Sequence, residues 1–231
     1  MSTKIKTPKT KASDMFFLAA VTFVLLLVQP ILNSLLNAYG FAWAIALRAI
    51  YIVIWAFGVK GIINVAKKDC GFDILKKEDA PSALQWMITG VFAAAVVAYF
   101  VWNQFHLLTI NITGLTSVKN IVAFISLLLM NASKATVLTL LIALVQKGTS
   151  LLGKAGKYVP FGGIAVGIIW AVMYILSSAE IWSSGIGFNW TYPLYQFAYG
   201  LILGIFFVLI GNKTKYAFPF IAVTSLFIFM A

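Results

Sequence analysis

The sequence predicts an all-α, polytopic transmembrane helix bundle with a cytoplasmic N-terminus, and three observations support this fold class. Hydrophobic residues make up 62% of the 231 residues, whereas charged residues make up only 10%. Soluble domains contain about 25% charged residues. Apolar runs close to bilayer length recur along the chain, and the positive charges fall between alternate runs. We therefore expect a single integral membrane domain over residues 15–231, preceded by a basic cytoplasmic tail over residues 1–14.

Seven apolar runs predict about seven transmembrane helices, because about 20 apolar residues span the hydrocarbon core. In chain order the runs are Met15–Leu36, Phe41–Val59, Leu84–Trp102, Ile121–Leu144, Phe161–Ala179, Pro193–Ile210 and Tyr216–Met230. The first run follows a lysine-rich leader, as a secretory signal does, but its roughly 22 residues exceed the length of a signal core. We interpret it as a retained helix. The longest polar insertion, residues 66–82, is predicted to be a cytoplasmic linker.

The lysines indicate the orientation of the chain. They precede the first run and follow the second, fourth and sixth runs, and only Lys119 falls on the other side. Since Lys and Arg in short loops stay cytoplasmic, the N-terminus is predicted to lie inside and Ala231 outside. The formal net charge of +11 is then explained by topology and by attraction to lipid headgroups, not by nucleic acid. We expect a multi-pass protein of the cell membrane, and the compact lysine-rich chain favours a bacterial source.

Three ionisable residues lie inside the apolar runs: Arg48, Lys134 and Glu180. Such residues are expensive in hydrocarbon and are functional candidates by default. A helix rise of about 1.5 Å per residue places Arg48 and Glu180 at overlapping depths near the outer side, and Lys134 nearer the cytoplasmic side. We therefore predict a buried Arg48–Glu180 ion pair across the second and fifth helices. Asn131 and Ser178 are further polar candidates in the fourth and fifth runs.

The residue inventory argues against a metal centre or a hydrolytic site. The chain has one histidine and one cysteine, which excludes a zinc cluster of these residues, and it contains no GxSxG or HExxH motif. We expect no metal and no cofactor. Gly200 and Gly204 form a GxxxG motif in the sixth run. This motif is typical of close helix packing, either within one chain or between two copies in a homo-oligomer.

Several segments occur in an order and spacing that resemble a known family. They are residues 71–77, the polar interruption 131–136, the end of the fifth run at 174–178, and residues 199–223. Together they look like the CAAX-protease and bacteriocin-processing (CPBP) membrane family, and the resemblance covers most of the chain. It implies packed transmembrane helices around a cavity that opens to the membrane.

The catalytic positions of the resembled family are replaced in this sequence. That family carries an EExxxR motif, then FxxxH, then a late histidine followed by an Asn or similar residue. The corresponding positions here are Asn131 and Ala132, then Thr136, then Tyr174 and Ser178, and finally Val223 and Phe227. None of these residues supplies the glutamate and histidine chemistry that the family uses, so we expect a non-catalytic member.

Three hypotheses for function remain open. The favoured one is a non-catalytic CAAX-protease-like protein that binds a membrane protein or an exported peptide, as in bacteriocin self-immunity or as an adaptor. The second is an intramembrane endopeptidase that uses Glu180, Ser178 and Arg48 as substitutes. The third is a small-molecule transport component. Its cavity would be made polar by amides of the first and fourth helices, namely Gln29, Asn33, Asn37 and Asn131.

Overall fold

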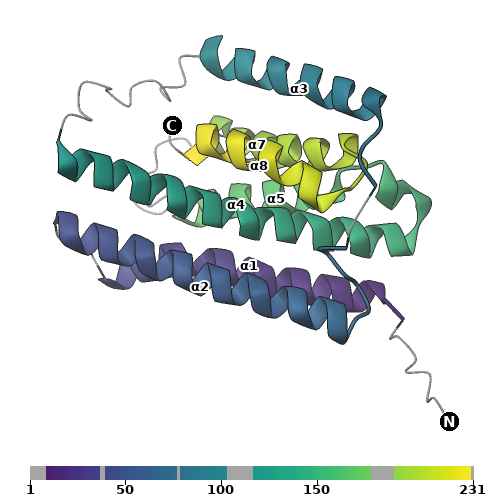
Figure 1. Ribbon diagram of the computed structural model, residues 1–231, viewed down its shortest axis with the longest axis horizontal. Coiled ribbons are helices and arrows are strands. Elements are labelled where there is room, and N and C mark those ends of the chain that lie inside the picture. The colour runs from purple at the N-terminus through teal and green to yellow at the C-terminus, as the bar shows by residue number, and fades with distance from the viewer. Residues whose placement is uncertain (1–8, 37–39, 77–78, 103–116, 178–189, 230–231) are drawn as a thin grey trace.

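The computed structural model describes residues 9–36, 40–76, 79–102, 117–177 and 190–229 (Figure 1). Within these ranges the chain forms helices and no strands. The helices are α1 (Ala12–Leu36), α2 (Phe41–Lys68), α3 (Ala83–Trp102), α4 (Val118–Leu152), α5 (Phe161–Ser177), α7 (Thr191–Leu209) and α8 (Thr214–Phe229), with the short 3₁₀ helix η3 (Lys154–Lys157) after α4. The predicted all-α fold class is therefore confirmed.

Each apolar run of the sequence coincides with one α-helix. Four of these helices, α1, α2, α4 and α7, are long and apolar enough to cross a membrane, while α3 and α5 are shorter apolar helices. Two helices extend beyond their runs, because α2 continues past Val59 to Lys68 and α4 continues past Leu144 to Leu152. Lysine and glutamine are good helix formers, so a helix can continue where the apolar stretch ends. The molecule is a helical bundle of the membrane type.

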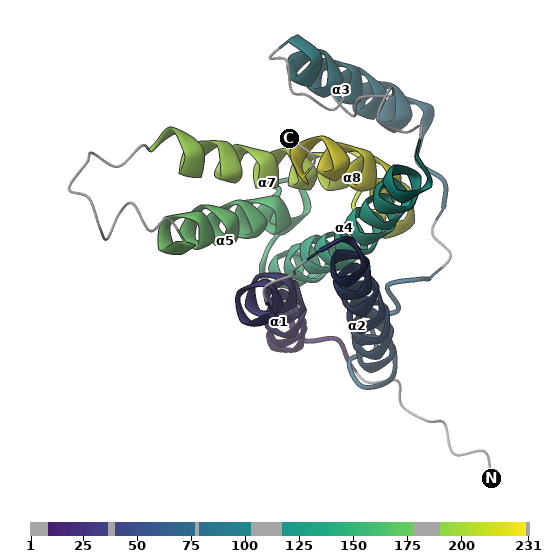
Figure 2. The same ribbon diagram turned by 90° about the vertical axis from the view of Figure 1, so that its left-hand side faces the viewer.

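The central helix of the bundle is α4, which packs on α1, α2, α5 and α8. Every residue from Val137 to Leu144 is buried, as expected of a helix that is apolar on all sides. Figure 2 shows α4 between the α1 and α2 pair and the α7 and α8 pair, with α3 at the edge. The helix α3 packs on α7 and α8.

The α5 and α7 helices approach each other through glycines on both sides. A Cβ built on Gly163 of α5 would lie 2.5 Å from the Cα of Gly204, and one on Gly200 of α7 would overlap the backbone of Gly167. Gly200 and Gly204 thus pack within the chain against a second GxxxG pair, Gly163 and Gly167. A side chain at any of these positions would separate the two backbones.

The lysine-rich loops gather at one end of the bundle. Lys213, before α8, donates a 3.1 Å hydrogen bond to the carbonyl of Ala80, before α3. Asn212, in the α7–α8 turn, donates from Nδ2 to the carbonyl of Lys157 in η3 at 3.0 Å. These contacts join loops that the alternation of lysines assigns to the same side of the membrane. We call this the lysine-bearing end; it is predicted to be cytoplasmic.

The linker after α2 docks on this end of the bundle. It begins at Asp69, because residues 66–68 form the last turn of α2. Cys70 and Ile74 are buried in the core, and Lys67 Nζ lies 2.8 Å from Asp73 Oδ2. The ammonium of Lys147 lies 5.2 Å above the ring centroid of Phe72. The apolar residues of the linker therefore pack on α4 and α2.

Candidate functional site: a two-chambered cavity at the lysine-bearing end

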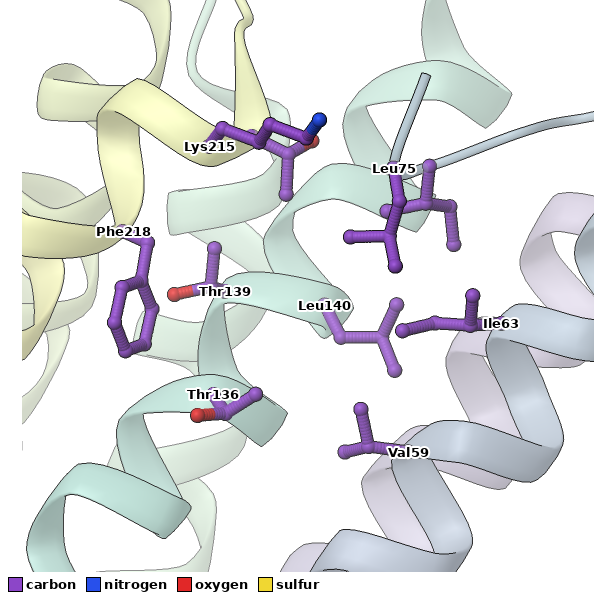
Figure 3. A pocket seen from close by; sticks show the side chains of 10 residues that line it. Val59, Ile63, Leu75, Thr136, Thr139, Leu140, Lys215 and Phe218 are labelled. Carbon is purple, nitrogen blue, oxygen red and sulfur yellow. The ribbon is translucent and has the colours of Figure 1, made fainter. Parts of the chain in front are cut away.

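A cavity of about 290 Å³ lies between α2, α4, α8 and the linker (Figure 3). We call it the apolar chamber. It is lined by Val59 and Ile63 of α2, Ile74 and Leu75 of the linker, Thr136, Thr139 and Leu140 of α4, and Thr214, Lys215 and Phe218 of α8. Its size is at the lower end of the range of about 300–1,000 Å³ that is typical of ligand sites.

The wall of the apolar chamber offers few polar groups. Thr136 donates its hydroxyl to the carbonyl of Ala132 at 3.0 Å, and Thr139 donates to Ala135 at 2.8 Å. Both hydroxyl protons are thereby used within α4. Lys215 is the single charged residue of the lining. Such a surface favours an apolar group with a negative charge near Lys215.

A second cavity, of about 330 Å³, adjoins the first. We call it the polar chamber. It is lined by Phe72, Asp73 and Ile74 of the linker, Ala143, Gln146, Lys147 and Ser150 of α4, Gly156 and Lys157 of η3, and Phe207, Gly211, Asn212 and Thr214 around the α7–α8 turn. Ile74 and Thr214 line both chambers, so the apolar and polar chambers meet at these two residues.

Gln146 fixes the wall of the polar chamber. Its Nε2 donates to the carbonyls of Gly156 and Val159 at 2.7 and 2.8 Å, and its Oε1 accepts from the amide of Gly162 at 3.0 Å. The side chain is almost fully buried. Gly162 lies in the first turn of α5, where amide groups have no partner within the helix. One buried amide group therefore holds η3 and the start of α5 against α4.

The α7–α8 turn carries an unusual asparagine. Asn212 has a φ of 58° and follows Gly211 with a φ of 82°, a backbone region that Asn and Gly tolerate best. The Nδ2 atom of Asn212 bonds Lys157, whereas its Oδ1 atom is buried with no hydrogen-bond partner among the described residues. This oxygen is therefore closed off from the polar chamber, although other atoms of Asn212 line it.

The electrostatics of the polar chamber are dominated by positive charge. Lys147 and Lys157 line it, and α8 begins at Thr214, where the positive end of the helix dipole favours an anion. The only acid of the lining, Asp73, is engaged by Lys67. The hydrogen bond from Lys67 is the main reason why the pKa of Asp73 lies below its usual range.

Arg48 lies apart from both chambers, near the N-terminal end of α2. Its Nη1 donates to the carbonyl of Ala123 at 2.9 Å and to the hydroxyl of Ser126 at 2.8 Å, both on α4. Glu180 and Ser178 lie outside the described residues, so the predicted Arg48–Glu180 pair stays a prediction. The contacts on α4 were not foreseen from the sequence, because a backbone carbonyl carries no signal in the residue pattern.

The family-motif positions on α4 have different surroundings. Thr136 lines the apolar chamber, whereas Ala132 is exposed. Asn131 is almost fully buried and lines neither chamber, and its Nδ2 has no hydrogen-bond partner in the described part of the chain. Lys134 is half-buried.

The motif positions on the other helices do not meet at the cavity either. The ring of Tyr174 stacks on Tyr192 of α7, with 5.7 Å between centroids. Val223 of α8 is 51% exposed, and the side chain of Phe227 lies outside the described residues. Among the motif positions with described side chains, Thr136 alone lines a chamber.

Neither the described residues nor the comparisons with known proteins point to a metal site or a family. In the part of the chain that the structure describes, no group of three or more His, Cys, Asp or Glu side chains could hold a metal ion. No protein-family model, no curated protein and no solved structure matches this chain. The cavity is therefore the feature of this chain that bears on its function.

Proposed function

We propose that this protein is a non-catalytic integral membrane protein that binds an amphiphilic ligand in the two-chambered cavity at its lysine-bearing end. The observation that carries the proposal is the junction of an apolar chamber with a basic polar chamber at Ile74 and Thr214. A ligand with an apolar part and a negatively charged part complements both chambers. Membrane proteins and exported peptides with these properties belong to the class of partner that the CPBP resemblance implies.

The chemistry of the lining supports binding rather than hydrolysis. General acid–base catalysis most often uses a histidine or a carboxylate within hydrogen-bond reach of the reacting atom. In the apolar chamber the hydroxyl protons of Thr136 and Thr139 are used within α4. In the polar chamber Asp73 is paired with Lys67 and Gln146 is fully engaged.

A titration tests binding directly. Leu75 is 52% exposed and lines the apolar chamber, so an environment-sensitive fluorophore on Leu75→Cys reports occupancy. The variant is made in a Cys70→Ala background and placed in nanodiscs. Dodecyl phosphate, a single-chain anionic amphiphile, should give a saturable change in fluorescence, and dodecanol should bind more weakly because it lacks the charge.

Two substitutions on α4 provide a matched pair for this titration. Thr136→Phe fills the apolar chamber and should weaken binding by about tenfold, because excluding two methylene groups removes about 0.8 kcal/mol each. Ser133→Phe adds similar bulk next to the chamber without lining it; Ser133, like Thr136, bonds the carbonyl of its own helix. A linear, unsaturable response, or an equal effect of both substitutions, would contradict the proposal.

The absence of catalysis needs its own assay. Purified protein in nanodiscs is incubated with prenylated peptides and with leader-peptide substrates, and these should remain intact. Cleavage that disappears in Glu180→Gln would favour the active endopeptidase with substituted residues.

The orientation of the cavity is also a proposal, and reporter fusions test it. A phosphatase reporter fused after Ala231 should be active outside the cell, while one fused after Lys77 should be silent. The opposite pattern would place the lysine-bearing end outside.

A small-molecule transport component is a second candidate, favoured by two buried polar atoms. Gln29 Oε1 on α1 and Asn131 Nδ2 on α4 have no hydrogen-bond partner among the described residues. If Asn131 has no ligand, Asn131→Leu should leave stability unchanged or raise it, since an unsatisfied buried amide is costly. Loss of ligand uptake without loss of stability would favour the transport function.

A further inference from the structure

The geometry of the two chambers points to an anionic glycerophospholipid, such as phosphatidylglycerol, as the occupant. This inference rests on the proposed function and names its ligand class. One acyl chain occupies the apolar chamber and the headgroup occupies the polar chamber. The lipid acts as a bound component that joins α4, α8 and the linker.

The apolar chamber fits the chain of such a lipid. Val59, Ile63 and Leu140 present aliphatic side chains from α2 and α4, and Phe218 closes the chamber from α8 (Figure 3). The hydroxyls of Thr136 and Thr139 offer no free proton to a ligand. A hydrocarbon chain loses no hydrogen bonds on entering such a space, whereas a peptide backbone would leave its amide groups unpaired there.

The phosphate is recognised by the basic side of the polar chamber. Lys147 is half-buried, and its ammonium is positioned by the ring of Phe72. Lys157 lines the same chamber from η3, and the first turn of α8 begins at Thr214, where the two chambers meet. Two ammonium groups and a helix N-terminus form a suitable environment for one phosphodiester.

The headgroup is selected by its charge. Lys147 and Lys157 both line the polar chamber, so the cationic choline and ethanolamine groups are disfavoured beside them. A phospholipid with a net negative charge is therefore preferred.

Native mass spectrometry tests this assignment on the full chain released from nanodiscs with equal amounts of phosphatidylglycerol and phosphatidylcholine. Wild type should retain one phosphatidylglycerol in preference to phosphatidylcholine. Lys147→Gln and Lys157→Gln should each reduce this preference about fivefold, the contribution of one lysine near a charged headgroup. Lys154→Gln is the matched control: Lys154 is exposed on η3 and does not line the chamber, so the preference should not change.

Two further variants test the apolar chamber. Thr136→Phe should lower retention of both lipids, because it fills the chain-binding chamber. Ser133→Phe adds similar bulk at a position that does not line the chamber and should leave retention of both lipids unchanged. Circular dichroism of each variant verifies that its helices are intact.

Several outcomes would overturn the inference. Retained lipid that mirrors the nanodisc composition would show no headgroup recognition; if dodecyl phosphate still binds saturably, the proposed function survives and only the lipid assignment fails. Displacement of the lipid by millimolar glycerol 1-phosphate would identify a site for free phosphate esters. One-for-one displacement by a prenylated peptide at equimolar concentration would identify a peptide as the preferred occupant.

Discussion

Arg48 of α2 donates a 2.8 Å hydrogen bond to the hydroxyl of Ser126 on α4. The same Nη1 atom bonds the carbonyl of Ala123 at 2.9 Å, and the Ser126 hydroxyl donates to that carbonyl at 2.7 Å. An arginine within an apolar helix must bond polar groups that remain available at its depth. Here these groups belong to the neighbouring helix, so the arginine joins the N-terminal halves of α2 and α4.

Removal of the Ser126 hydroxyl tests this contact. Ser126→Ala should lower the free energy of unfolding by about 1 kcal/mol, as is typical of an interhelical hydrogen bond in a membrane protein. Ser133→Ala is the control, because Ser133 bonds only the carbonyl of Leu129 in its own helix. Reversible unfolding in mixed micelles provides the measurement, and equal losses in both variants would contradict the role of Arg48.

The predicted pair of Arg48 with Glu180 can be examined in the same assay. If the carboxylate is a buried partner, Glu180→Ala should cost about 3–5 kcal/mol by leaving a buried charge unpaired. If Glu180→Ala lowers the free energy of unfolding by less than Ser126→Ala does, the contacts on α4 stabilise the arginine and the predicted pair is wrong.

Gln146 should be among the most sensitive polar positions of the bundle. Gln146→Leu keeps much of the buried volume but leaves the amide of Gly162 and the carbonyls of Gly156 and Val159 without their partner. We expect the free energy of unfolding to fall by about 3 kcal/mol or more, since each unsatisfied buried group costs about 1–3 kcal/mol. The same unfolding assay measures it. Wild-type stability of Gln146→Leu would show that water replaces the side chain.

The glycines should respond to alanine with opposite signs. In Gly200→Ala the new methyl group would overlap the backbone of Gly167, so we expect a loss of about 1–3 kcal/mol from overpacking. Gly61 of α2 has no neighbour within 4 Å of a built Cβ. Gly61→Ala should therefore raise the free energy of unfolding by up to about 1 kcal/mol, because alanine has a higher helix propensity than glycine. Thermal unfolding of the two variants distinguishes these effects; destabilisation of equal size would indicate that packing between α5 and α7 is not the cause.

The attachment of the linker should depend on pH through Asp73. Its hydrogen bond from Lys67 lowers the pKa of the folded carboxyl below the unfolded value of 3.8. A lowered folded pKa contributes stability above the unfolded pKa, and this contribution is lost as the pH falls through the folded value. Hydrogen exchange of residues 69–76, corrected for intrinsic rates, should show protection at pH 7 that decreases below about pH 4.

In Asp73→Asn, residues 69–76 should already be less protected from hydrogen exchange at pH 7. Burial, followed by Asp14 and Asp69, raises the pKa of the Cys70 thiol, so a released linker should also make this thiol react faster with maleimide at pH 7. Unchanged protection and unchanged thiol reactivity in Asp73→Asn would show that the ion pair does not hold the linker.

The helices could be predicted from the sequence because hydropathy over a span of residues reports burial in a bilayer directly. The neighbours that each helix packs against could not be predicted. The sequence marks Gly200 and Gly204 but does not say that they face Gly163 and Gly167, although the latter pair carries the same GxxxG signal. Gln146 was missed because a single glutamine beside a lysine resembles the polar end of a helix. Its role depends on main-chain groups of η3 and α5, which no residue pattern displays.

The cavity could not be predicted from the sequence for a related reason. Its two chambers meet at Ile74 and Thr214, residues that come together only because the linker and α8 both pack against α4. The resemblance to CPBP proteases implied a cavity, and it placed Thr136 at a motif position. It gave no indication of the basic polar chamber formed by Lys147, Lys157 and Asn212.

The stoichiometry of amphiphile binding, measured by isothermal titration calorimetry in nanodiscs, tests the central claim most directly. Dodecyl phosphate should bind wild type at one site per chain with a negative heat-capacity change, since apolar surface is buried. Thr136→Phe should weaken this binding about tenfold, and Ser133→Phe should leave the affinity unchanged. Heat that grows without saturation in wild type, or an isotherm that Thr136→Phe leaves intact, would show that the amphiphile partitions into lipid and that the two-chambered cavity is not its site.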